Sequence, residues 1–598
     1  MAIGIKKIKV KIDGKDYSNI VPSDFASLSL SQGIEQPHSL TMIFSRDAFE
    51  KSNELAGSSI SFLGKKIEIN VKAESSELTK VEEELKFLGI ITSISANVKN
   101  GLSSDSIVIS AASPEIIMDD GNHTRSFEEM SISDVVSKVT GDYGLVCPVT
   151  VNPESTGNHE YIVQYQESSL EFLQRLARKY GHWFYYDGAK LTFGKAEKKE
   201  QIKLDVGKNL SDFQIKLNLQ AYKFGLVAYD YADDGSQIYQ SQDSNQNFTQ
   251  SKKGKKVESL SNQIFTHESK EFYNHHLTKG NQQAHLDKRV KIKKSGKGSR
   301  MVMCSGQSDC PLLKPGVIVN VNEKSNSGNT SHGSYLIFEV HHSLDRNGEY
   351  TNSFSGVPSE IEYPFYSNPY NIPFCETQSA IVVENEDPDN FGRVRVRFFW
   401  EQDIVSPWIR IVNPYAGKEK GHMFIPEIDE EVLVGFEGGN AEKPYVIGSM
   451  YHAKAYPESW KPDNNDIKAI RTRSGHTIEF RDTDGEEEVW MYDYNKENYF
   501  IKLKTHAKEI TIEAIEHIEL KAKNITLKAE KDLNMEATDA TLKAGGNIDN
   551  NASGNITTKA SGNVSVEASS NAKLKGGVNT NIEAGAQIVE KAGMIKLN

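Results

Sequence analysis

The sequence of 598 residues contains little cysteine and no long apolar segment, and each absence excludes a class of protein. The four cysteines are too few and too scattered for a disulfide framework, and two of them have a poor spacing for zinc. They are Cys147, Cys304, Cys310 and Cys375. No run approaches the length that crosses a bilayer, and the first residues lack the apolar core of a signal peptide. We therefore expect a chain made soluble in the cytoplasm, with any export following another route.

Motifs that carry catalysis or bind cofactors are also missing. There is no Gly-x-Ser-x-Gly elbow, no P-loop and no dinucleotide fingerprint. The pairs His275–His276 and His341–His342 have no helical partner four residues away, and adjacent residues of a strand point to opposite faces. A net charge of −13 gives no general attraction for nucleic acid. The chain is therefore predicted to have no catalytic residues, no metal site and no cofactor, and not to be an enzyme.

After Phe500 the sequence contains no phenylalanine, tyrosine, tryptophan, proline, cysteine or arginine, and it shows a short repeat instead. A small residue, nearly always alanine, recurs at every eighth position from Ala544 to Ala592. Eight residues overshoot two turns of an α-helix by roughly 80°, so this stripe would bury no face of a helix. In a strand, offsets of two and four share a face, and segments such as Ser553–Asn555 then supply a bend. The octads predict a β-solenoid needle over residues 506–598.

The period leaves the winding of this needle open. Three chains can interlace on a triangular prism, or one chain can coil on itself, and the repeat fits both. A further interpretation is a disordered polar tail rich in Asn, Ser and Gly, although disorder does not need a strict register.

Residues 376–452 predict a second all-β piece. The run Arg393–Trp400 alternates at first, with apolar side chains on one side and arginines on the other. Further short strands are predicted at Trp408–Val412, Glu431–Val434 and Tyr445–Ile447. Such strands in so short a length fit a small closed barrel of the OB type.

OB barrels often bind single-stranded nucleic acid through basic side chains and stacked aromatic rings. Arg393, Arg395 and Arg397 together with Trp400 fit that function. They equally fit a charged outer face with the tryptophan packed at a strand end. Nucleic-acid binding is therefore the weaker interpretation, and no specific nucleic acid is predicted.

The first 370 residues are mostly strand-like, with two helices. One is predicted from Ser126 or Ser131 to about Thr140. The second starts at a capping box, with Ser168 as N-cap and Glu171 at the third helical position, and Gly181 ends it.

Two more features of this part are predicted from local pattern. A hairpin turns at Asp187–Gly188, and its aromatic residues are expected in the core. The segment Ser251–Arg300 is strongly basic. It is interpreted as a solvated loop and strand edge, or as a patch that steers an acidic partner.

The barrel and the capped helix together resemble a known family. The residues that carry the resemblance are Asp387, Gly392–Phe398, Trp408–Arg410, Gly417, Gly421, Ile425–Pro426, Glu431–Phe436, Gly439, Pro444, Gly448, Ser169–Leu176 and Gly181–Tyr186. They are similar to VgrG proteins, the spike proteins of type VI secretion systems, which are related to the hubs and spikes of contractile phage tails. Asp429–Glu430 departs locally from the family's usual residues before the Glu-Val pair.

The resemblance implies a mainly β chain in consecutive pieces. They are a hub of β-barrel-like subdomains with a few helices at 1–370, an OB-fold barrel at 376–452, a connecting hairpin or stem at 453–505, and an intertwined trimeric needle at 506–598. The implied function is a trimeric membrane-puncturing spike at the tip of a contractile secretion tube. The implied location is cytoplasmic before firing and then secreted through the apparatus, without a signal peptide.

The partners are also implied by the resemblance. They are an Hcp-type hexameric tube protein at the hub, a PAAR-type tip protein at the needle end, effectors, baseplate proteins, and a target membrane contacted transiently. The last turn of a needle leaves open strand edges and apolar side chains that need a cover. The residues expected to bind the tip protein are Met594, Ile595, Lys596, Leu597 and Asn598.

Other functions fit parts of the chain. A contractile phage tail, a pyocin or an extracellular injection particle would use a similar spike. A phage-tail hydrolase is a further alternative, but residues 453–505 hold a hairpin around Asp484–Gly485 and are too few for a hydrolase with its own core.

Overall fold

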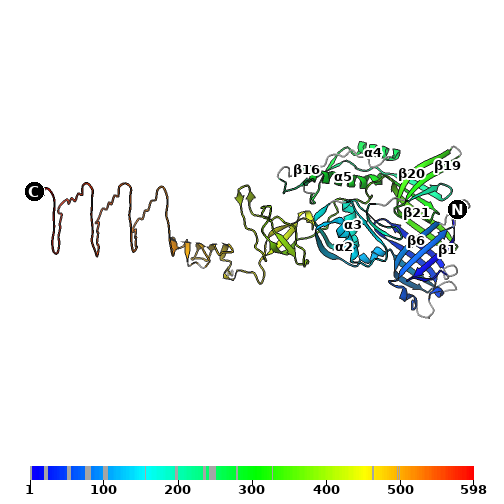
Figure 1. The fold of residues 1–598 in the computed structure, drawn as a ribbon, viewed down its shortest axis with the longest axis horizontal. Coiled ribbons are helices and arrows are strands. Elements are labelled where there is room, and N and C mark those ends of the chain that lie inside the picture. Colours follow the sequence, from blue (N-terminus) through cyan, green and yellow to red (C-terminus); the bar gives the residue numbers. More distant parts are fainter. Residues whose placement is uncertain are drawn as a thin grey trace. The chain divides into compact units, whose positions relative to one another are not determined.

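The computed structural model describes most of the chain, in ranges separated by short gaps. The ranges are 3–18, 25–49, 56–73, 83–98, 105–154, 157–195, 200–233, 238–240, 251–277, 280–325, 328–460, 464–494, 496 and 498–597. The chain divides into two compact units, Met1–Ser459 and Trp460–Asn598, which are treated separately below (Figure 1). In these ranges, no helix is both long enough and apolar enough to cross a membrane.

A large and mostly antiparallel sheet forms much of the first unit. Its strands pair in the order β13-β19-β20-β3-β4-β7-β6-β5-β1-β21-β18-β14, β2 pairs with β1, and β20 also pairs with β21. The strands are β1 (Ile3–Ile12), β2 (Lys15–Asp16), β3 (Phe25–Gly33), β4 (Gln36–Ser45), β5 (Lys66–Ala73), β6 (Glu83–Asn97), β7 (Ser106–Ala112), β13 (Gln201–Asp205), β14 (Leu210–Leu217), β18 (Val302–Ser308), β19 (Ile318–Ser325), β20 (Gly328–Asp345) and β21 (Glu349–Pro358).

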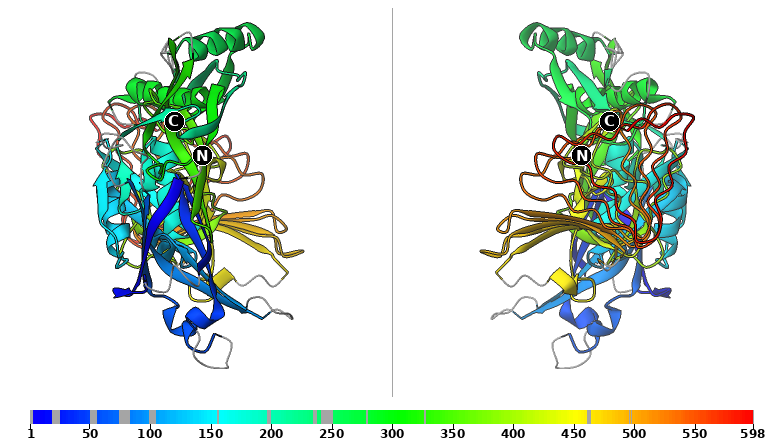
Figure 2. Two further views of the ribbon diagram at one scale, coloured as in Figure 1. Left: turned by 90° about the vertical axis from the view of Figure 1, so that its right-hand side faces the viewer. Right: turned by 90° about the vertical axis from the view of Figure 1, so that its left-hand side faces the viewer.

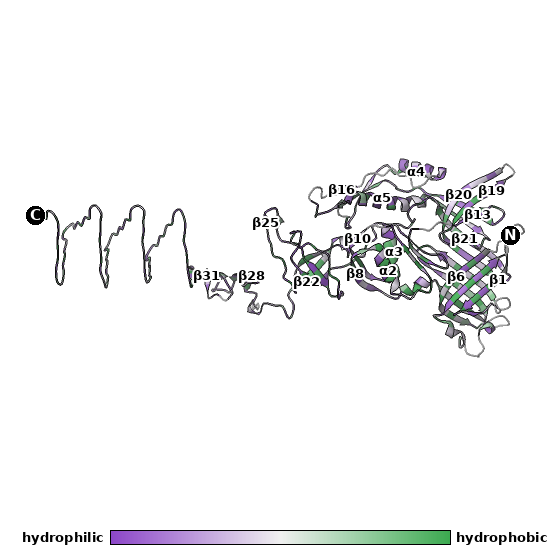
Figure 3. Ribbon diagram, viewed as in Figure 1, coloured by the Kyte–Doolittle hydropathy of each residue, from purple (hydrophilic) through white to green (hydrophobic). Residues whose placement is uncertain are grey.

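The two faces of this sheet differ because successive side chains of a strand alternate. In β3, Leu28 and Leu30 are buried while Ser29 faces solvent. The same alternation produces the green and purple stripes of the strands in Figure 3. Buried aliphatic and aromatic residues from the sheet and from helix α3 (Ser169–Tyr180) form the main core. The prediction of a mainly β chain is therefore confirmed.

Both predicted helices are present, and the first starts at Ser131, the second of its two predicted starting points, since Ser126 lies in a strand. Helix α2 (Ile132–Gly141) has Ser131 as its N-cap, and the Ser131 hydroxyl accepts a hydrogen bond from the Asp134 amide. Helix α3 has the capping box of Ser168 and Glu171. Gly181 ends α3 with a φ of 71°, which is a conformation that glycine adopts readily.

Short strands surround these helices. They are β8 (His123–Ser131), β9 (Val149–Asn152), β10 (Asn158–Glu167), β11 (Trp183–Tyr186) and β12 (Leu191–Gly194). The β11–β12 pair is the hairpin predicted around Asp187–Gly188. Single-turn 3₁₀ helices lie at Arg46–Ala48, Ser59–Phe62, Pro114–Met118, Ser299–Met301, Glu437–Gly439 and Glu458–Trp460.

The prediction of a loop and strand edge for the basic segment Ser251–Arg300 is wrong. Helices α4 (Lys252–Ile264) and α5 (Gln282–Gly298) occupy most of it, and Figure 2 shows α4 at one end of the first unit. The Ser251 hydroxyl caps α4 by accepting from the Gly254 amide at 3.0 Å. Small side chains at helical spacing then face inward, a pattern that is easily missed beside so many lysines. Helix α5 packs beside β15 (Phe224–Tyr229) and β16 (Ile238–Gln240), whereas α4 packs beside β18. Strand β17 (Ser269–Phe272) pairs with β15.

The predicted barrel is an open four-stranded ladder of hydrogen bonds. The order is β23-β22-β26-β27, with β22 at Gln378–Glu384, β23 at Arg395–Phe398, β26 at Glu431–Phe436 and β27 at Pro444–Ser449. A separate two-stranded pair joins β24 (Ala416–Gly417) to β25 (Lys420–Gly421).

The strand predicted at Trp408–Val412 is absent. The four paired strands therefore do not close into a barrel through continuous backbone hydrogen bonds. This segment makes only single bridges, from Ile409 to Val394 and from Ile411 to Val446. Pro407 precedes it and a second proline follows it, and proline removes the amide that a continuous strand pairing needs.

The second unit contains a five-stranded antiparallel sheet in sequence order. Its strands are β28 (Ile467–Arg471), β29 (Thr477–Arg481), β30 (Glu488–Tyr492), β31 (Tyr499–Lys504) and β32 (Glu509–Ala514). The β29–β30 hairpin is the one predicted around Asp484–Gly485. One face buries Glu479, which accepts hydrogen bonds from Tyr492 and Arg481. The other face exposes Ile478 and Ile501.

Residues 516–597 form no strand or helix, and every one of them is exposed. The chain bends directly after Ala544, Ala552, Ala560 and Ala568, in the positions that the octads predict. No backbone hydrogen bond joins any two residues of this described segment, which Figure 1 draws as a plain orange to red trace. The β-ladders of a needle therefore stay a prediction.

Candidate functional site

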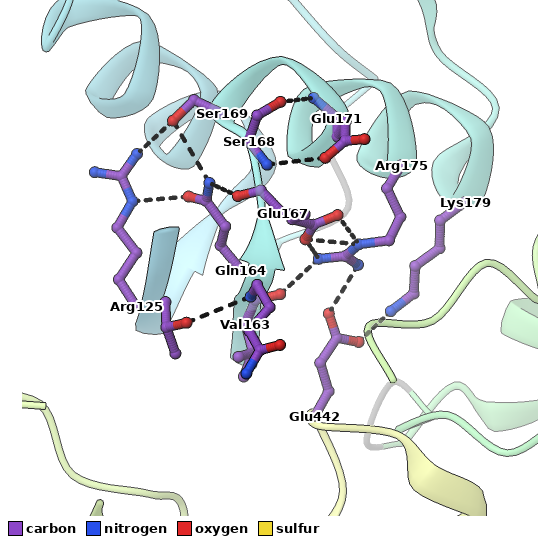
Figure 4. A network of polar contacts seen from close by, with 12 residues as sticks. Arg125, Val163, Gln164, Glu167, Ser168, Ser169, Glu171, Arg175, Lys179 and Glu442 are labelled. Carbon is purple, nitrogen blue, oxygen red and sulfur yellow. Dashed lines mark hydrogen bonds and ion pairs between the residues drawn. The ribbon is translucent and has the colours of Figure 1, made fainter. Parts of the chain in front are cut away.

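A cluster of buried charges joins helix α3 to the loop between β26 and β27. The Lys179 ammonium donates to Glu442 Oε2, and Arg175 Nη1 lies 3.6 Å from Glu442 Oε1 (Figure 4). Arg175 also donates to Glu167 Oε1 at 2.7 Å. The side chains of Arg175, Lys179 and Glu442 are each at most 6% exposed. We call this cluster, where the first part of the chain meets the barrel segment, the joint.

The local sequence explains how α3 presents these charges. Arg175 and Lys179 are four residues apart, so they lie one above the other on the same face of the helix. The capping box holds the first turn: the Ser168 amide donates to Glu171 Oε2 at 3.0 Å, and the Glu171 amide donates to Ser168 Oγ at 3.2 Å. Gly181 must remain small, since a Cβ there would lie 2.9 Å from the Tyr363 ring.

Glu442 is ionised because two cations face it. Burial alone would raise the pKa of Glu442, but the charges of Lys179 and Arg175 outweigh it and hold that pKa below its ordinary value. The buried cations Lys179 and Arg175 depend on this carboxylate in turn, because a buried charge without a partner raises the free energy of the folded state.

Neutral histidines surround the same charges. The Arg289 guanidinium donates to His285 Nε2 at 3.2 Å, and the Tyr180 hydroxyl lies 3.4 Å from His159 Nδ1. Burial, with the nearby Arg289 charge added, lowers the pKa of His159 to about 3 and that of His285 to about 2. His276 Nε2 donates to the Glu442 carbonyl at 2.7 Å and links this group to the barrel loop.

The joint also has an apolar part. Tyr161, Val163 and Tyr165 project from one side of β10 and pack into the core of the barrel segment beside Val396 and Phe398. On β8, which pairs with β10, the Ser126 hydroxyl donates to Glu401 at 2.6 Å. The barrel segment is therefore held to the hub at several points by buried contacts.

Two of the three arginines considered for nucleic-acid binding are engaged within the protein. Arg393 is buried and donates to Asp387 at 2.7 Å. This hydrogen bond lowers the pKa of Asp387 and outweighs the opposing effect of burial. Arg395 donates to Glu128 and to Glu384, whereas Arg397 is exposed.

Trp400 is not available as a stacking platform. It stacks on Phe398 with ring centroids 5.0 Å apart, and it also meets Tyr165 edge-on. The arrangement matches the interpretation of a charged outer face with the tryptophan packed at the strand end, and it disfavours a nucleic-acid groove.

The second histidine pair lies on a strand of the large sheet. His341 is exposed while His342 is buried and contacts the Tyr350 hydroxyl at 2.6 Å, so the two point to opposite faces as predicted. Over the described ranges, no group of three or more His, Cys, Asp or Glu side chains is placed to hold a metal ion.

The residues predicted to bind a tip protein lie at the end of the second unit. Met594, Ile595 and Leu597 are 72%, 50% and 89% exposed. Lys596 is exposed as well, and Asn598 lies outside the described residues. Their role stays a prediction.

Sequence reasoning missed the charges of the joint. Lys179 and Glu442 are separated by 263 positions, and neither belongs to a motif. The available signal was weak: two cations at helical spacing within an otherwise apolar stripe of α3, which indicates that they face a partner.

Comparisons with known proteins agree with this architecture. The profile of the phage tail baseplate hub (GPD) family matches residues 32–348, and that of the type VI secretion system/phage-baseplate injector OB domain matches residues 378–451. The actin cross-linking toxin VgrG1 of Vibrio cholerae is 22% identical over 66% of this chain and 38% of its own length. The type VI secretion system spike protein VgrG5 of Pseudomonas aeruginosa is 24% identical over 66% of this chain and 55% of its own.

The chain thus spans about two fifths to half of the length of these relatives. Among solved structures, a chain of the lidless PdpA–VgrG complex has a TM-score of 0.54 at 10% identity, over 85% of this chain and 99% of that chain. A chain of the lidded Francisella complex has a TM-score of 0.51 at 10% identity, over 85% and 80%. These two likenesses concern the fold.

Removing the carboxylate of the joint should weaken it strongly. In Glu442→Gln, Lys179 and Arg175 remain buried without their counter-charge, which costs about 3–5 kcal/mol of unfolding free energy. The matched control Glu384→Gln removes a half-exposed partner of Arg395 and should cost less than about 1 kcal/mol. Calorimetry and hydrogen exchange over residues 376–449 measure both. Equal losses in the two variants would contradict this role of Glu442.

Acid should loosen the same joint in the unaltered chain. Because the pKa of Glu442 is held below its ordinary value of 4.5, its ionised form stabilises the fold above pH 4.5, and this stability is lost as the pH falls below that value. His159 and His285 stay neutral in the folded protein, because burial lowers their pKa values from 6.5. Their contribution to stability is therefore complete above pH 6.5 and is lost progressively as the pH falls below that value. Exchange at the joint should therefore accelerate below pH 6.5, and a rate independent of pH after correction for intrinsic exchange would contradict it.

Proposed function

Because the chain belongs to the phage tail baseplate hub family and to its VgrG branch, we propose that it forms a trimeric spike at the tip of a contractile secretion tube. The spike punctures a target membrane and carries effectors and a tip protein. The observation that carries this proposal is the segment 516–597, which is regular in its bends yet has no backbone partner of its own.

The first step is the winding of the needle. Backbone amides and carbonyls need partners wherever they leave water, and one copy supplies none over this segment. Three copies wound on one axis would pair each octad with octads of its neighbours and enclose the alanine positions. The exposed apolar face of the β28–β32 sheet, which includes Ile510 at 70% exposure, would meet the other copies in the same way.

The second step is the transfer of force. A spike that is pushed along its axis needs a hub and a barrel that move as one body. The joint at Glu442 and the packing of β10 against the barrel core supply that connection. The single bridges that Ile409 and Ile411 form with neighbouring strands mark where the OB barrel would close around this core in the assembled spike.

The third step concerns the partners. We propose that the hub sits on a hexameric Hcp-type tube and that baseplate proteins surround it. Most charged groups of α5 are paired within the chain, such as Lys293 with Glu271, whereas Lys252, Lys253 and Lys256 on α4 are exposed. These α4 lysines are our candidates for the tube contact.

The proposed role is structural, without an enzymatic step in this chain. The spike is assembled in the cytoplasm and leaves through the apparatus when the sheath contracts. A phage tail, pyocin or extracellular injection particle is the alternative setting, and the same geometry would serve there.

The oligomeric state tests the needle directly. Light scattering of the full chain should give three times 66.7 kDa, about 200 kDa, because the needle winds from three copies. Particles of 66.7 kDa at micromolar concentration would contradict the proposal and favour a solenoid that coils on itself.

Deleting the chain after Gly546 tests the function of the needle. The hub and the barrel should stay folded, since their cores lie before residue 450, but effector delivery should be abolished. Circular dichroism monitors the fold and a secretion assay monitors delivery. Effector delivery at the normal level by the truncated chain would show that the needle is dispensable.

The proposed tip site has its own test. Replacing Met594, Ile595 and Leu597 by serine should weaken binding of a PAAR-type tip protein by at least about tenfold, because their apolar surface is what a cover would bury. The matched control replaces Val566, an exposed valine 83% accessible inside the repeat, by serine. Equal effects of the two changes on tip binding would argue against the assignment.

A further inference from the structure

One position of the repeat carries charges of alternating sign. It stands directly before the small residue that ends each unit, and its members are all exposed in the single copy. We call these positions the charge column. In chain order they are Glu513, Lys521, Lys528, Glu536, Lys543, Asn551, Lys559, Glu567, Lys575, Glu583 and Lys591. From Lys559 onward, every step along the column reverses the sign of the charge.

The alternation is specific to this column. Adjacent residues of a strand point to opposite faces, so a column next to the enclosed alanines lies on the outside of the needle, together with the position two residues earlier. That earlier position is mostly uncharged and shows no such order. Its residues are Asp549, Thr557, Ser565, Lys573, Asn581 and Val589. A solvated face needs polar residues but no order of sign, so the order indicates that neighbouring members of the column meet.

A single copy does not provide these meetings. After Ala514, the one ion pair in the described tail joins Lys521 to Glu519 of the same octad, at 3.4 Å. The later members of the column make no ion pair within that range. Any pairing of the column therefore arises when the needle winds.

The winding of the proposed trimer decides which octads meet. Three copies related by a threefold axis place the same octad at one height, one on each face of the prism. With its next octad, each chain moves to the next face and climbs one strand spacing, about 4.8 Å. On any face, the strand above a given octad is therefore the next octad of a neighbouring copy. Successive members of the charge column then lie side by side across two copies.

The order of the charges favours this register over the others. Of the ten steps between successive members of the column, seven join opposite charges and one, from Lys521 to Lys528, joins like charges. Of the nine pairs that lie two members apart, five join like charges and two join opposite charges. Opposite charges on neighbouring strands stabilise a sheet and like charges destabilise it. A register without any offset would set each charge beside its own copies.

We propose that the charge column sets the register between copies of the needle, so that each octad meets the next octad of a neighbouring copy. This assignment rests on the proposed trimeric spike and names the surface by which the copies recognise one another. The ammonium of Lys559 pairs with the carboxylate of Glu567 in a second copy, which also lies beside Lys575 of the third. The alanine positions inside the needle are nearly identical from octad to octad and cannot make this choice.

A disulfide trap tests the register. In Lys559→Cys/Glu567→Cys, thiols of different copies would lie one strand spacing apart, within the Cα separation that a disulfide spans. Each copy would be linked to both others, so mild oxidation should give a covalent species of three times 66.7 kDa, about 200 kDa, on a denaturing gel without reductant. The matched control Lys559→Cys/Lys575→Cys separates the thiols by two strand spacings and should stay at 66.7 kDa. The four native cysteines are buried and do not compete.

The outcomes separate this proposal from the proposed function. Particles with the mass of one copy in solution would overturn the trimer and the register together. Trimers in which the first variant stays unlinked, or in which the control is linked as well, would overturn the register alone.

A swap of two charges tests whether the column selects the register. Glu567→Lys with Lys575→Glu keeps the composition, but two of the four contacts in the last part of the column become like-charge contacts. Hydrogen exchange over residues 547–592 should become at least about threefold faster at low salt, and the difference should fade at about 1 M salt. Inverting every charge from Lys559 to Lys591 restores the alternation and should restore the original rate.

The sign of the change in this swap is decisive. With an offset of two octads, the swapped residues would gain opposite neighbours, and exchange would slow down. Without an offset, or without any contact between the charges, the rate would not change. Slower or unchanged exchange would each overturn the proposal.

Discussion

The backbone of residues 516–597 is the constraint on which the rest of the molecule depends. Its bends recur with the period of the sequence, yet none of its described amides bonds to another residue of the segment. An irregular tail would not keep such a register, and a finished single-chain solenoid would not leave its backbone open. This contrast supports the proposal that the remaining partners of the repeat come from outside this copy. Every proposal about the needle follows from that need, and the small, aromatic-free side chains of the octads suit the narrow axis that would result.

The first unit obeys a different constraint, which is the burial of charge. Arg175, Lys179 and Glu442 lie where water does not reach them, and each is tolerable only while the others stay in place. A purely apolar contact between β10 and the barrel core would hold the two parts together but would allow them to slide. The ion pairs permit one geometry only, so the joint combines adhesion with a fixed orientation. A spike that transmits force along its axis requires both properties.

Local signals in the sequence predicted local structure well. The capping box at Ser168, the helix after Ser131, the hairpin at Asp484–Gly485 and the octad bends are set by residues close in the chain, and all appear where they were expected. Two of the failures share a cause, because they depend on residues far apart in the chain. The helices of the basic segment are stabilised by packing of their inward-facing residues against other parts of the chain, and the pairing of Lys179 with Glu442 spans 263 positions. The strand expected at Trp408–Val412 failed because prolines flank an otherwise strand-like pattern.

The two units therefore differ in what stabilises them. The hub and the barrel bury their own cores and can fold in one copy. The second unit exposes an apolar sheet face and an unpaired backbone. In the proposed spike, its free energy of folding would be linked to association with the other copies and would vary with concentration. Assembly in that order is favourable for a spike: folded hubs first bring the copies together, and the needle then winds from chains that are already aligned at one end. The local concentration of the tails would be far higher than that of free chains, which lowers the entropic cost of threading them.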